Sequence, residues 1–432
     1  MERTILNELR KWKQSAHRLP LIINGARQVG KTWILQHFGK TEYKHLAYIN
    51  FDNRDSRTDS LFQDYNIQRI LTLVEAIAKV PVVPEETLIV FDEIQEVPQG
   101  LGVLKYFAED APGYHVAVAG SLLGIMLHKD ASFPVGKVDS LSLYPMSFEE
   151  FMIAMDERRA LDILRSGDWQ LIDSMHGFYM DMLRQYLFVG GMPAAVKACT
   201  EQRGVLEVRR LQEQIISNYR MDISKHTTRT EVQRINIIYD SMPAQLAREN
   251  KKFIYGAAAK GARAREYEGA IQWMEDAGIL NRVYAVQKPA LPLRFYENRD
   301  AFKLYFSDCG LLGAMTHTEP FTLLQNSSVF EEYKGAFVEQ FVLQQLRLSG
   351  LPIYYYSREN AQMEIDFLLQ KGDMLVPIEA KSGNNLKSKS LNQYRQINHP
   401  ALSVKTSVLP YKRNDDLVNL PLYAVGLLPK MM

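Results

Sequence analysis

The segment LPLIINGARQVGKTWILQHF (19–38) constrains the fold most, because it reads as a short apolar strand, a glycine-bounded loop and a helix. The loop Gly25–Thr32 fits the pattern G-x-x-x-x-G-K-[ST]. Gly25 and Gly30 let backbone N–H groups turn inward onto phosphate oxygens, and the following helix N-terminus adds positive dipole. We therefore expect a phosphate-binding loop between the strand and the helix.

The residue types of this loop predict separate roles. Lys31 can reach the β- and γ-phosphates of a nucleotide, and the Thr32 hydroxyl can ligate Mg²⁺. We expect the nucleotide to be bound by one continuous run of residues: Gly25, Ala26, Arg27, Gln28, Val29, Gly30, Lys31, Thr32 and Trp33.

A second run, ETLIVFDEI (86–94), reads as a buried strand that ends in two acids. An acid at the tip of an apolar strand is costly unless it is solvated or bound to a metal ion. We expect Asp92 to belong to the nucleotide site and to hold Mg²⁺ through water. Glu93 would orient and deprotonate the attacking water. The two motifs together predict ATP hydrolysis.

A third strand, YHVAVAGS (114–121), ends at Ser121, which we expect to sense the γ-phosphate as part of the catalytic set. Strands near 46–51, 88–91 and 115–119 alternate with helical segments. This alternation predicts an α/β domain with a parallel sheet and helices on both faces. The nucleotide site would lie at the carboxyl ends of the strands.

The middle of the chain reads differently. After SLSLYPMSFEEFM (140–152) the pattern is mostly helical to about residue 250, with a long helix over 206–225 and a turn at GGMPAAV (190–196). The runs VYAVQKPA (283–290) and LRFYEN (293–298) read as the hairpin of a winged-helix region. FKLYFSDCGLL (302–312) then reads as an apolar strand and turn.

Near the end, EIDFLLQKGDMLVPIEAKSG (364–383) reads as two strands joined by a polar turn, with Asp366 in the first and Glu379 and Lys381 in the second. Two carboxylates can hold Mg²⁺ or Mn²⁺, and a nearby lysine can activate a water against a phosphodiester. This D-x(n)-E-x-K arrangement is typical of metal-dependent nucleases. An amphipathic helix over 333–346 carries Glu339, which would add a third carboxylate ligand.

The charge pattern is local, because the formal net charge is only +1. Basic residues gather over Arg248–Arg265 and again over Lys381–Arg413, where a DNA backbone could bind. The alternative reading of the first cluster is a solvated helical face. Two distant cysteines argue against disulfides or structural zinc and suit a reducing cytoplasm. No signal peptide or membrane-spanning run is visible, so we expect a soluble cytoplasmic protein without a membrane partner.

The order of the motifs GARQVGKT, FDEIQ, LYPMSFEEF, VGGMP, FKLYFSD, GAFVE and EIDFLL…IEAKSG resembles the prokaryotic AAA-like P-loop ATPases that carry a C-terminal domain of unknown function with a PD-(D/E)xK nuclease-like fold. The resemblance implies an ATPase core over 1–145, a helical lid over 146–225, a winged-helix region over 226–318 and a restriction-endonuclease-like α/β domain over 319–432. It also implies Mg²⁺ with ATP at Gly25–Thr32, Asp92 and Glu93.

In the same way, the resemblance implies Glu339, Asp366 and Glu379 as metal ligands, with Lys381 beside them. One departure is Gly136-Lys137, where a Gly-Arg pair is expected. Lysine lacks the planar bidentate fork of arginine, so the resemblance does not supply an arginine finger from this position. An arginine acting in trans would require at least a homodimer.

The sequence thus favours an Mg²⁺-dependent ATPase coupled to a nuclease-like, DNA-directed domain. The alternative is an ATP-dependent signalling switch or scaffold whose nuclease-like domain is catalytically inactive. A small-molecule kinase is a weaker reading, because Glu93 directly after Asp92 favours water as the nucleophile.

Overall fold

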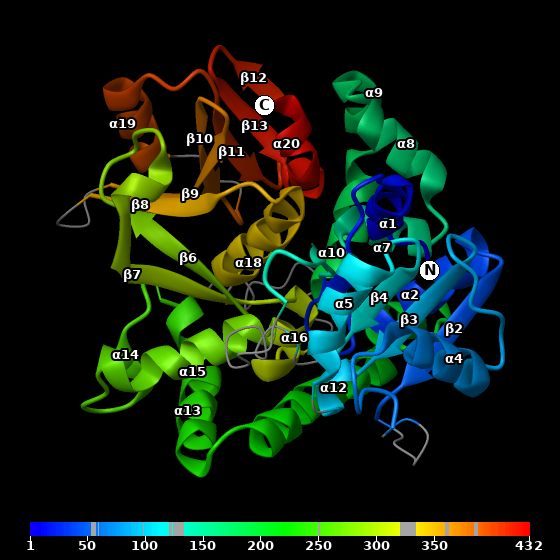
Figure 1. The fold of residues 1–432 in the computed structure, drawn as a ribbon. Helices are drawn as coiled ribbons and strands as arrows, with labels where there is room; N and C mark the ends of the chain where they lie inside the picture. Colours follow the sequence, from blue (N-terminus) through cyan, green and yellow to red (C-terminus); the bar gives the residue numbers. More distant parts are fainter. Residues whose placement is uncertain are drawn as a thin grey trace. The chain divides into compact units, whose positions relative to one another are not determined.

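The computed structural model describes residues 1–52, 58, 60–97, 99–120, 123, 134–248, 251–319, 334–358, 363–383 and 388–432. The chain divides into two compact units. The N-terminal unit comprises Glu2–Tyr144 and the short segment Asp276–Ile279. The C-terminal unit comprises Pro145–Glu275 and Leu280–Met432, together with Met1. Figure 1 shows the elements of both units along the chain.

The N-terminal unit is built on a five-stranded, fully parallel sheet with the order β2-β3-β4-β1-β5. Strand β4 lies between β1 and β3, so the strand before the glycine loop is one strand away from the strand that ends at Asp92. The strands are β1 (Leu21–Asn24), β2 (His45–Asn50), β3 (Thr87–Asp92), β4 (His115–Ala119) and β5 (Asp139–Ser142). The parallel α/β sheet predicted from the sequence is confirmed.

The helices of this unit pack their apolar faces against the sheet. Helices α4 and α5 share one apolar cluster with the strand residues Ile22, Ile89 and Val118, whose side chains are buried. The helical elements are α1 (Ile5–Gln14), α2 (Lys31–Glu42), α4 (Ile67–Ala78), α5 (Val103–Asp110) and the 3₁₀ turns η1 (Ile94–Glu96) and η2 (Gly100–Gly102).

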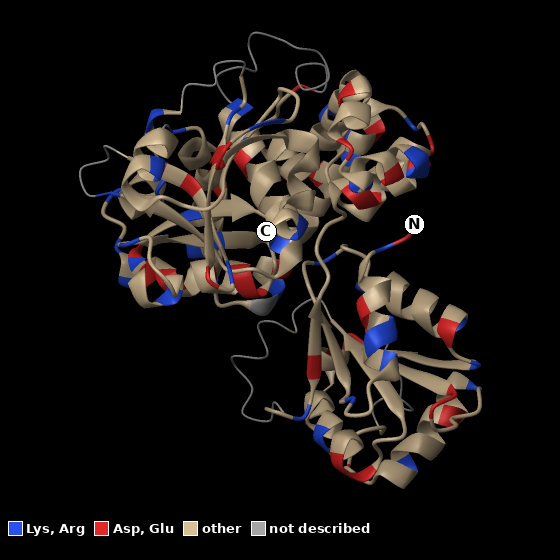
Figure 2. Ribbon diagram, turned by 90° about the horizontal axis from the view of Figure 1, so that it is seen from above, with Lys and Arg blue, Asp and Glu red and all other residues tan. Residues whose placement is uncertain are grey.

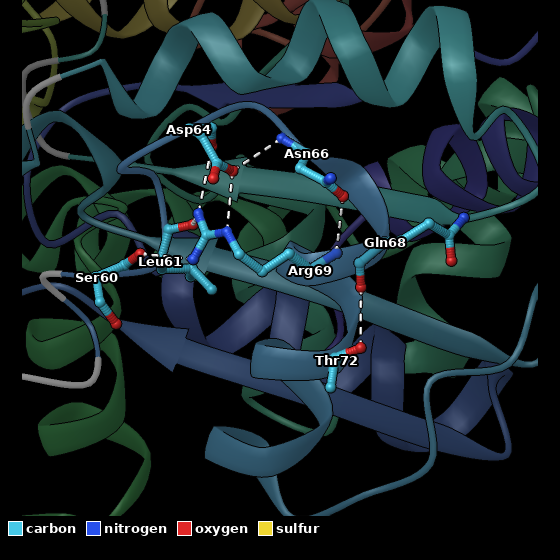
Figure 3. A network of polar contacts seen from close by, with 7 residues as sticks. All are labelled: Ser60, Leu61, Asp64, Asn66, Gln68, Arg69 and Thr72. Carbon is cyan, nitrogen blue, oxygen red and sulfur yellow. Dashed lines mark hydrogen bonds and ion pairs between the residues drawn. The ribbon is translucent and has the colours of Figure 1, made fainter.

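A polar network fixes the entry into α4 (Figure 3). The Asn66 side chain caps the helix by accepting from the Arg69 N–H at 3.1 Å. The Arg69 guanidinium donates to the Asp64 carboxylate at 2.9 Å and to the Ser60 and Leu61 carbonyls at 3.0 and 3.1 Å. One arginine therefore ties down the chain that leads into the helix.

The C-terminal unit begins with helices, as the sequence predicted. Two of them start at a capping box, in which Ser147 and Thr228 each exchange hydrogen bonds with a glutamate three residues later. The helices before the first strand are α7 (Phe148–Ala154), α8 (Arg158–Ser166), α9 (Trp169–Ser174), α10 (His176–Val189), α11 (Pro193–Thr200), α12 (Val205–His226), α13 (Arg229–Leu246), α14 (Tyr255–Ala258) and α15 (Ala264–Asp276).

A mixed eight-stranded sheet follows, with the order β12-β13-β11-β10-β9-β8-β6-β7. Its strands are β6 (Leu280–Val286), β7 (Glu297–Phe306), β8 (Ile353–Ser357), β9 (Glu364–Lys371), β10 (Met374–Ala380), β11 (Ser403–Ser407), β12 (Lys412–Asn414) and β13 (Leu417–Pro421). The remaining elements are α16 (Cys309–Met315), α18 (Lys334–Leu346), α19 (Lys389–Asn398), α20 (Leu428–Met431) and the 3₁₀ turns η3 (Leu293–Tyr296), η5 (Arg347–Ser349) and η6 (Leu422–Leu427).

The hairpin of the expected winged-helix region differs from its sequence-based prediction. The partner of β6 is β7, whose main part is the run FKLYF, and Leu280 pairs with Phe306 at its end. Residues Leu293–Tyr296, expected to lie in a strand, form the turn η3 instead. The expected turn after FKLYF is a helix, because Asp308 caps α16 by accepting from the Leu311 N–H. Through β6 the hairpin joins β8 in the same sheet that holds β9 and β10.

Helix α18 is buried on all sides from Ala336 to Leu346, so its polar side chains must find partners inside the unit. Gln344 donates to the Asp308 carboxylate at 3.1 Å, and Gly191 in the GGMP turn donates to the same carboxylate at 2.6 Å. Burial raises the pKa of Asp308. This acid joins the turn before α11, the start of α16 and helix α18.

Basic residues (Lys and Arg) and acidic residues (Asp and Glu) are spread along the ribbons of both units (Figure 2). Within the described residues, no helix is both long and apolar enough to cross a membrane.

Candidate functional site

The glycine loop between β1 and α2 has a backbone that only glycine fits at two positions. Gly25 has φ +143°, and a Cβ atom there would lie 2.1 Å from the Leu143 carbonyl oxygen. Gly30 has φ +97° and is the N-cap residue of α2. Both conformations are costly for other residues. The loop therefore presents its N–H groups ahead of a helix N-terminus, the arrangement that binds phosphate.

Lys31 is the first residue of α2 and is 7% exposed. Its ammonium donates to the carbonyl oxygens of Gly25 and Ala26, both at 2.8 Å. These two contacts hold the Lys31 ammonium at the glycine loop.

Arg3 braces the same loop from the N-terminal segment and was not predicted. Its guanidinium donates to the Val29 carbonyl at 2.9 Å and to the Tyr144 carbonyl at 2.6 Å. The residue is buried. A lone arginine near the start of a chain gives no sequence signal for such a role.

Asp92 lies at the end of β3 and joins the two predicted motifs. The Thr32 hydroxyl donates to its Oδ2 atom at 2.8 Å, although the two residues are far apart in sequence. The Tyr48 hydroxyl donates to the same atom at 2.7 Å. Burial raises the pKa of Asp92, while the hydrogen bonds from Tyr48 and Thr32 favour its charged form. Tyr48 was missed, because a tyrosine in an apolar strand reads as core.

Thr32 and Asp92 fit Mg²⁺ chemistry. A hydroxyl and a carboxylate are oxygen ligands, and both hydrogen bonds to Asp92 Oδ2 come from neutral hydroxyls. That these two residues hold a metal ion together stays a prediction.

Glu93 follows directly after β3 and has a left-handed backbone with φ +53°. Its N–H donates to the Ala119 carbonyl at the end of β4, at 2.8 Å. Its carboxylate accepts a hydrogen bond from the Gln95 side chain. The predicted base is therefore held at the carboxyl edge of the sheet by its backbone and by one neighbouring amide. Ser121, the predicted sensor, lies outside the described residues.

Other residues of the predicted nucleotide site lie as follows. Gln28 has φ +67° within the loop. The Trp33 ring is 44% exposed and stacks on His37 with ring centroids 4.8 Å apart. Lys137, which stands where an arginine was expected, forms an ion pair with Glu109 at 2.9 Å.

The C-terminal carboxylates have very different surroundings. Glu339 on α18 is buried and its Oε1 atom lies 2.6 Å from the Lys251 ammonium. Its Oε2 atom accepts from the Tyr305 hydroxyl at 3.0 Å and lies 3.9 Å from the Lys303 ammonium. Burial would raise the pKa of Glu339, but the charges of Lys251 and Lys303 lower it overall.

Lys303 on β7 is the centre of this arrangement, with a side chain that is 1% exposed. Its ammonium lies 2.6 Å from Glu364 Oε1 and 5.0 Å from the centre of the Tyr355 ring. Burial lowers the pKa of Lys303, but the charges of Glu339, Glu364 and Asp366 raise it overall. Lys251 was expected only as one of the cations of Arg248–Arg265 where DNA could bind, and Lys303 was not singled out. A lysine inside the apolar run FKLYF was the available signal, because a buried lysine requires acidic partners.

Asp366 on β9 accepts from the Ala380 N–H at 2.9 Å. Burial and the nearby charge of Glu339 raise the pKa of Asp366 to about 7. On β10, Glu379 forms an ion pair with Lys381 at 2.5 Å, and its Oε2 atom is buried without a hydrogen-bond partner. The antiparallel β9–β10 hairpin itself matches the prediction.

These residues do not assemble as a metal ligand set. Among the residues that the structure describes, no three His, Cys, Asp or Glu side chains are grouped to hold a metal ion. Glu339 and Glu379 instead each face a lysine ammonium at 2.6 and 2.5 Å. A divalent ion placed there would meet positive charge, so the residues do not fit the implied Mg²⁺ or Mn²⁺.

The two basic segments also differ from each other. In the first, Lys251 is paired with Glu339, whereas five cations are exposed: Arg248, Lys252, Lys260, Arg263 and Arg265. In the second, Arg395 is paired with Asp416 and Lys405 is buried, while Lys412 and Arg413 are exposed on β12. Lys387 lies outside the described residues.

Comparison with known families places a match on the nucleotide-binding region. Residues 17–152 match the model of an AAA domain. Residues 180–322 match a domain of unknown function (DUF8612), and residues 334–424 match a second one (DUF4143). The first match supports the prediction of an AAA-like domain in that part of the chain. Neither of the others assigns a nuclease-like fold or an activity.

No curated protein matches this chain. Among solved structures, the Orc1 protein of Aeropyrum pernix in complex with DNA is 12% identical, with a TM-score of 0.29, and the match covers 74% of this chain and 94% of that one. Cdc6p of Pyrobaculum aerophilum is 12% identical, with a TM-score of 0.26, and the match covers 74% of this chain and 93% of that one. Drosophila ORC bound to DNA is 14% identical, with a TM-score of 0.29, and the match covers 72% of this chain and 94% of that one. TM-scores this low do not establish a shared overall fold.

Proposed function

We propose that the N-terminal unit binds and hydrolyses ATP with Mg²⁺. The observation that carries this proposal is the 2.8 Å hydrogen bond from Thr32 to Asp92, which joins the glycine loop to the end of β3. The AAA domain match over 17–152 supports it. Thr32 and Asp92 would hold the magnesium ion, which supplies charge neutralisation at the β- and γ-phosphates.

The roles of the other residues follow from their positions. Lys31 and the backbone N–H groups of the loop would bind the phosphates, because the Lys31 ammonium lies at the loop, where it donates to the Gly25 and Ala26 carbonyl oxygens. Glu93 would orient and deprotonate the attacking water. Glu93 has a left-handed backbone directly after the last residue of β3, at the carboxyl edge of the sheet. Ser121 stays a proposed γ-phosphate sensor from the sequence alone.

Glu93→Gln tests the assignment of the base. The variant should bind ATP with the affinity of the wild type and hydrolyse it at least ~100-fold more slowly. Glu96→Gln, in the 3₁₀ turn that follows, is the matched control and should retain activity. Wild-type turnover by Glu93→Gln would show that another residue acts as the base.

We further propose that nucleotide occupancy controls a DNA-directed C-terminal unit. The five exposed cations of Arg248–Arg265 support a phosphate-backbone partner. Binding of a labelled duplex should weaken steeply with salt, and it should change when ATP is added to Glu93→Gln. A salt-independent interaction would argue against phosphate contacts.

A second candidate function is a switch or scaffold whose nuclease-like domain does not cut. The lysines on Glu339 and Glu379 favour it over a metal-dependent nuclease. Plasmid incubated with protein and Mg²⁺ or Mn²⁺, with and without ATP, separates the two, because only a nuclease would nick it. A cytoplasmic location and a homo-oligomer stay predictions from the sequence, and the two free cysteines suit the former.

A further inference from the structure

The C-terminal unit holds a set of buried and half-buried charged residues that the proposed ATPase does not use. We call it the carboxylate cluster: Glu339, Glu364 and Asp366 with the ammonium groups of Lys251 and Lys303. Lys303 Nζ lies 2.6 Å from Glu364 Oε1 and 3.9 Å from Glu339 Oε2. Lys251 Nζ lies 2.6 Å from Glu339 Oε1. The two lysines come from the segment after α13 and from β7, and the acids come from α18 and β9.

We propose that Lys303 is the resident cation of the carboxylate cluster, in the role that a divalent ion has in metal-dependent nucleases, and that the C-terminal unit acts by binding rather than by metal-dependent cleavage. This inference deepens the proposed function, because it selects the second of the two readings of the C-terminal unit. It does not depend on ATP hydrolysis.

The first argument is the occupation of the carboxylate oxygens. Glu339 Oε1 faces Lys251, and Oε2 accepts from the Tyr305 hydroxyl at 3.0 Å. Asp366 Oδ2 already accepts from the Ala380 N–H at 2.9 Å. A metal ion would have to replace these donors, each of which compensates for burial.

The second argument is electrostatic. Like charges a few ångströms apart inside a protein repel each other strongly, and a divalent ion doubles the repulsion that a monovalent ion would meet. A Mg²⁺ ion on Glu339 would lie close to two ammonium groups, because both are already within 4 Å of its oxygens. The lysines therefore oppose the binding of a second cation.

The third argument is that Lys303 cannot readily move away. Its side chain is 1% exposed, and its backbone lies in β7, paired with Val283 of β6. Lys252 also forms a β-bridge with Lys303. A charge at this depth is stable only beside its acidic partners. The ammonium is thus a built-in part of the unit and not a surface group that a metal ion could displace.

The decisive experiment counts Mn²⁺ bound to nucleotide-free, full-length protein by electron paramagnetic resonance. Wild type, Asp366→Asn and Asp373→Asn are compared. Asp373 is an exposed acid in the turn of the same β9–β10 hairpin and serves as the control. All three should bind the same number of ions, since any weak site at Thr32 and Asp92 is common to them. One additional ion in the wild type that Asp366→Asn loses would overturn the proposal.

Removal of the lysine provides a second, independent readout. Lys303→Met should lower the melting temperature by about 10 °C in EDTA. Added Mn²⁺ should restore part of this loss, because the ion can then take the place of the ammonium. Wild type and Lys303→Arg should show no such gain. If Lys303→Met melts at the same temperature with and without Mn²⁺, Lys303 does not stand at a cation position and the proposal fails.

A substitute variant and an ATPase measurement complete the test. If Lys303→Met does not fold, the double variant Lys303→Met/Glu364→Gln replaces it, since it also removes the carboxylate that would be left unpaired. Its melting temperature should likewise rise with Mn²⁺. The ATPase rate is measured on every variant, because the loss of hydrolysis expected in Glu93→Gln and the number of Mn²⁺ ions bound by Asp366→Asn are separate readouts of separate claims.

Discussion

The two carboxylate sites of this chain differ in what surrounds their acids. Asp92 in the N-terminal unit receives hydrogen bonds from the hydroxyls of Thr32 and Tyr48, which carry no charge. Glu339 in the C-terminal unit receives one hydroxyl, from Tyr305, and also an ammonium from Lys251. Both acids are buried. The first site retains a negative charge that can attract a cation, whereas the second is already neutralised.

This difference shows that acidic residues at strand ends and on neighbouring helices do not by themselves define a metal site. The cations that are buried beside the acids decide whether a metal ion can bind. In the N-terminal unit the lysine of the loop donates to the carbonyl oxygens of Gly25 and Ala26. In the C-terminal unit the lysines are the counter-ions of the acids.

The largest effect is expected from removing a counter-ion. Lys303→Met would leave Glu339 and Glu364 without a shared ammonium, and breaking a buried pair costs about 3–5 kcal/mol. Lys31→Met should cost about 1 kcal/mol in stability, for the hydrogen bonds that it removes from the Gly25 and Ala26 carbonyl oxygens. Urea unfolding of the full-length variants measures both values. Equal losses would remove the distinction between the two lysines.

The next effect is on catalysis. Asp92→Asn should reduce ATP hydrolysis by about 100-fold or more, roughly 3 kcal/mol of barrier, because the amide cannot replace the charge that holds magnesium. Asp366→Asn makes the same chemical change in the C-terminal unit and should leave the ATPase rate unchanged. Steady-state phosphate release at saturating ATP measures both. A comparable loss in Asp366→Asn would mean that the two sites share one function.

Much of the nucleotide site could be predicted from the sequence, because its chemistry is local. The glycine positions, Lys31 and Thr32 follow from one short motif, and Asp92 follows from an apolar strand that ends in an acid. The parallel sheet was predictable for the same reason, since alternating apolar strands and helices leave few arrangements. Tyr48 was not, because its role depends on the register of β2 beside β3.

The C-terminal site was harder to predict, because its partners come from distant parts of the chain. Lys251, Lys303 and Glu339 lie on three separate segments, and only the folded sheet brings them together. The sequence showed a carboxylate pattern but not which cations it meets. The start of β7 was predicted too early, because the run LRFYEN begins with the 3₁₀ turn η3 and β7 follows that turn.

Buried titratable groups extend the comparison to acid stability. His115 in the N-terminal unit accepts or donates a 2.6 Å hydrogen bond with the Tyr43 hydroxyl, and burial, together with Arg18 and Lys13, lowers its pKa to about 4. It is buried neutral, whereas Lys303 is buried charged. The unfolded chain therefore binds the His115 proton between about pH 6.5 and 4 and the folded chain does not. Stability should fall by about 3 kcal/mol as pH decreases through this window.

His115→Gln tests this expectation by urea unfolding between pH 4 and 7. Its stability should depend less on pH than that of the wild type, and the two curves should converge as pH falls. His399→Gln replaces an exposed histidine in the C-terminal unit and should follow the wild-type curve. Parallel curves for wild type and His115→Gln would show that His115 titrates normally in the folded protein.

The smallest expected effect compares two tyrosine hydroxyls, each of which donates to a buried carboxylate. Tyr48→Phe removes the 2.7 Å hydrogen bond to Asp92, and Tyr305→Phe removes the 3.0 Å bond to Glu339. Each should cost about 1 kcal/mol of stability. Only Tyr48→Phe should also affect catalysis, because Asp92 then holds its charge less well, and we expect about a fivefold higher Mg²⁺ requirement for ATP hydrolysis. Magnesium titration of the ATPase rate measures this shift. A matching shift in Tyr305→Phe would connect the carboxylate cluster to the nucleotide site and contradict its role as a metal-free set of paired charges.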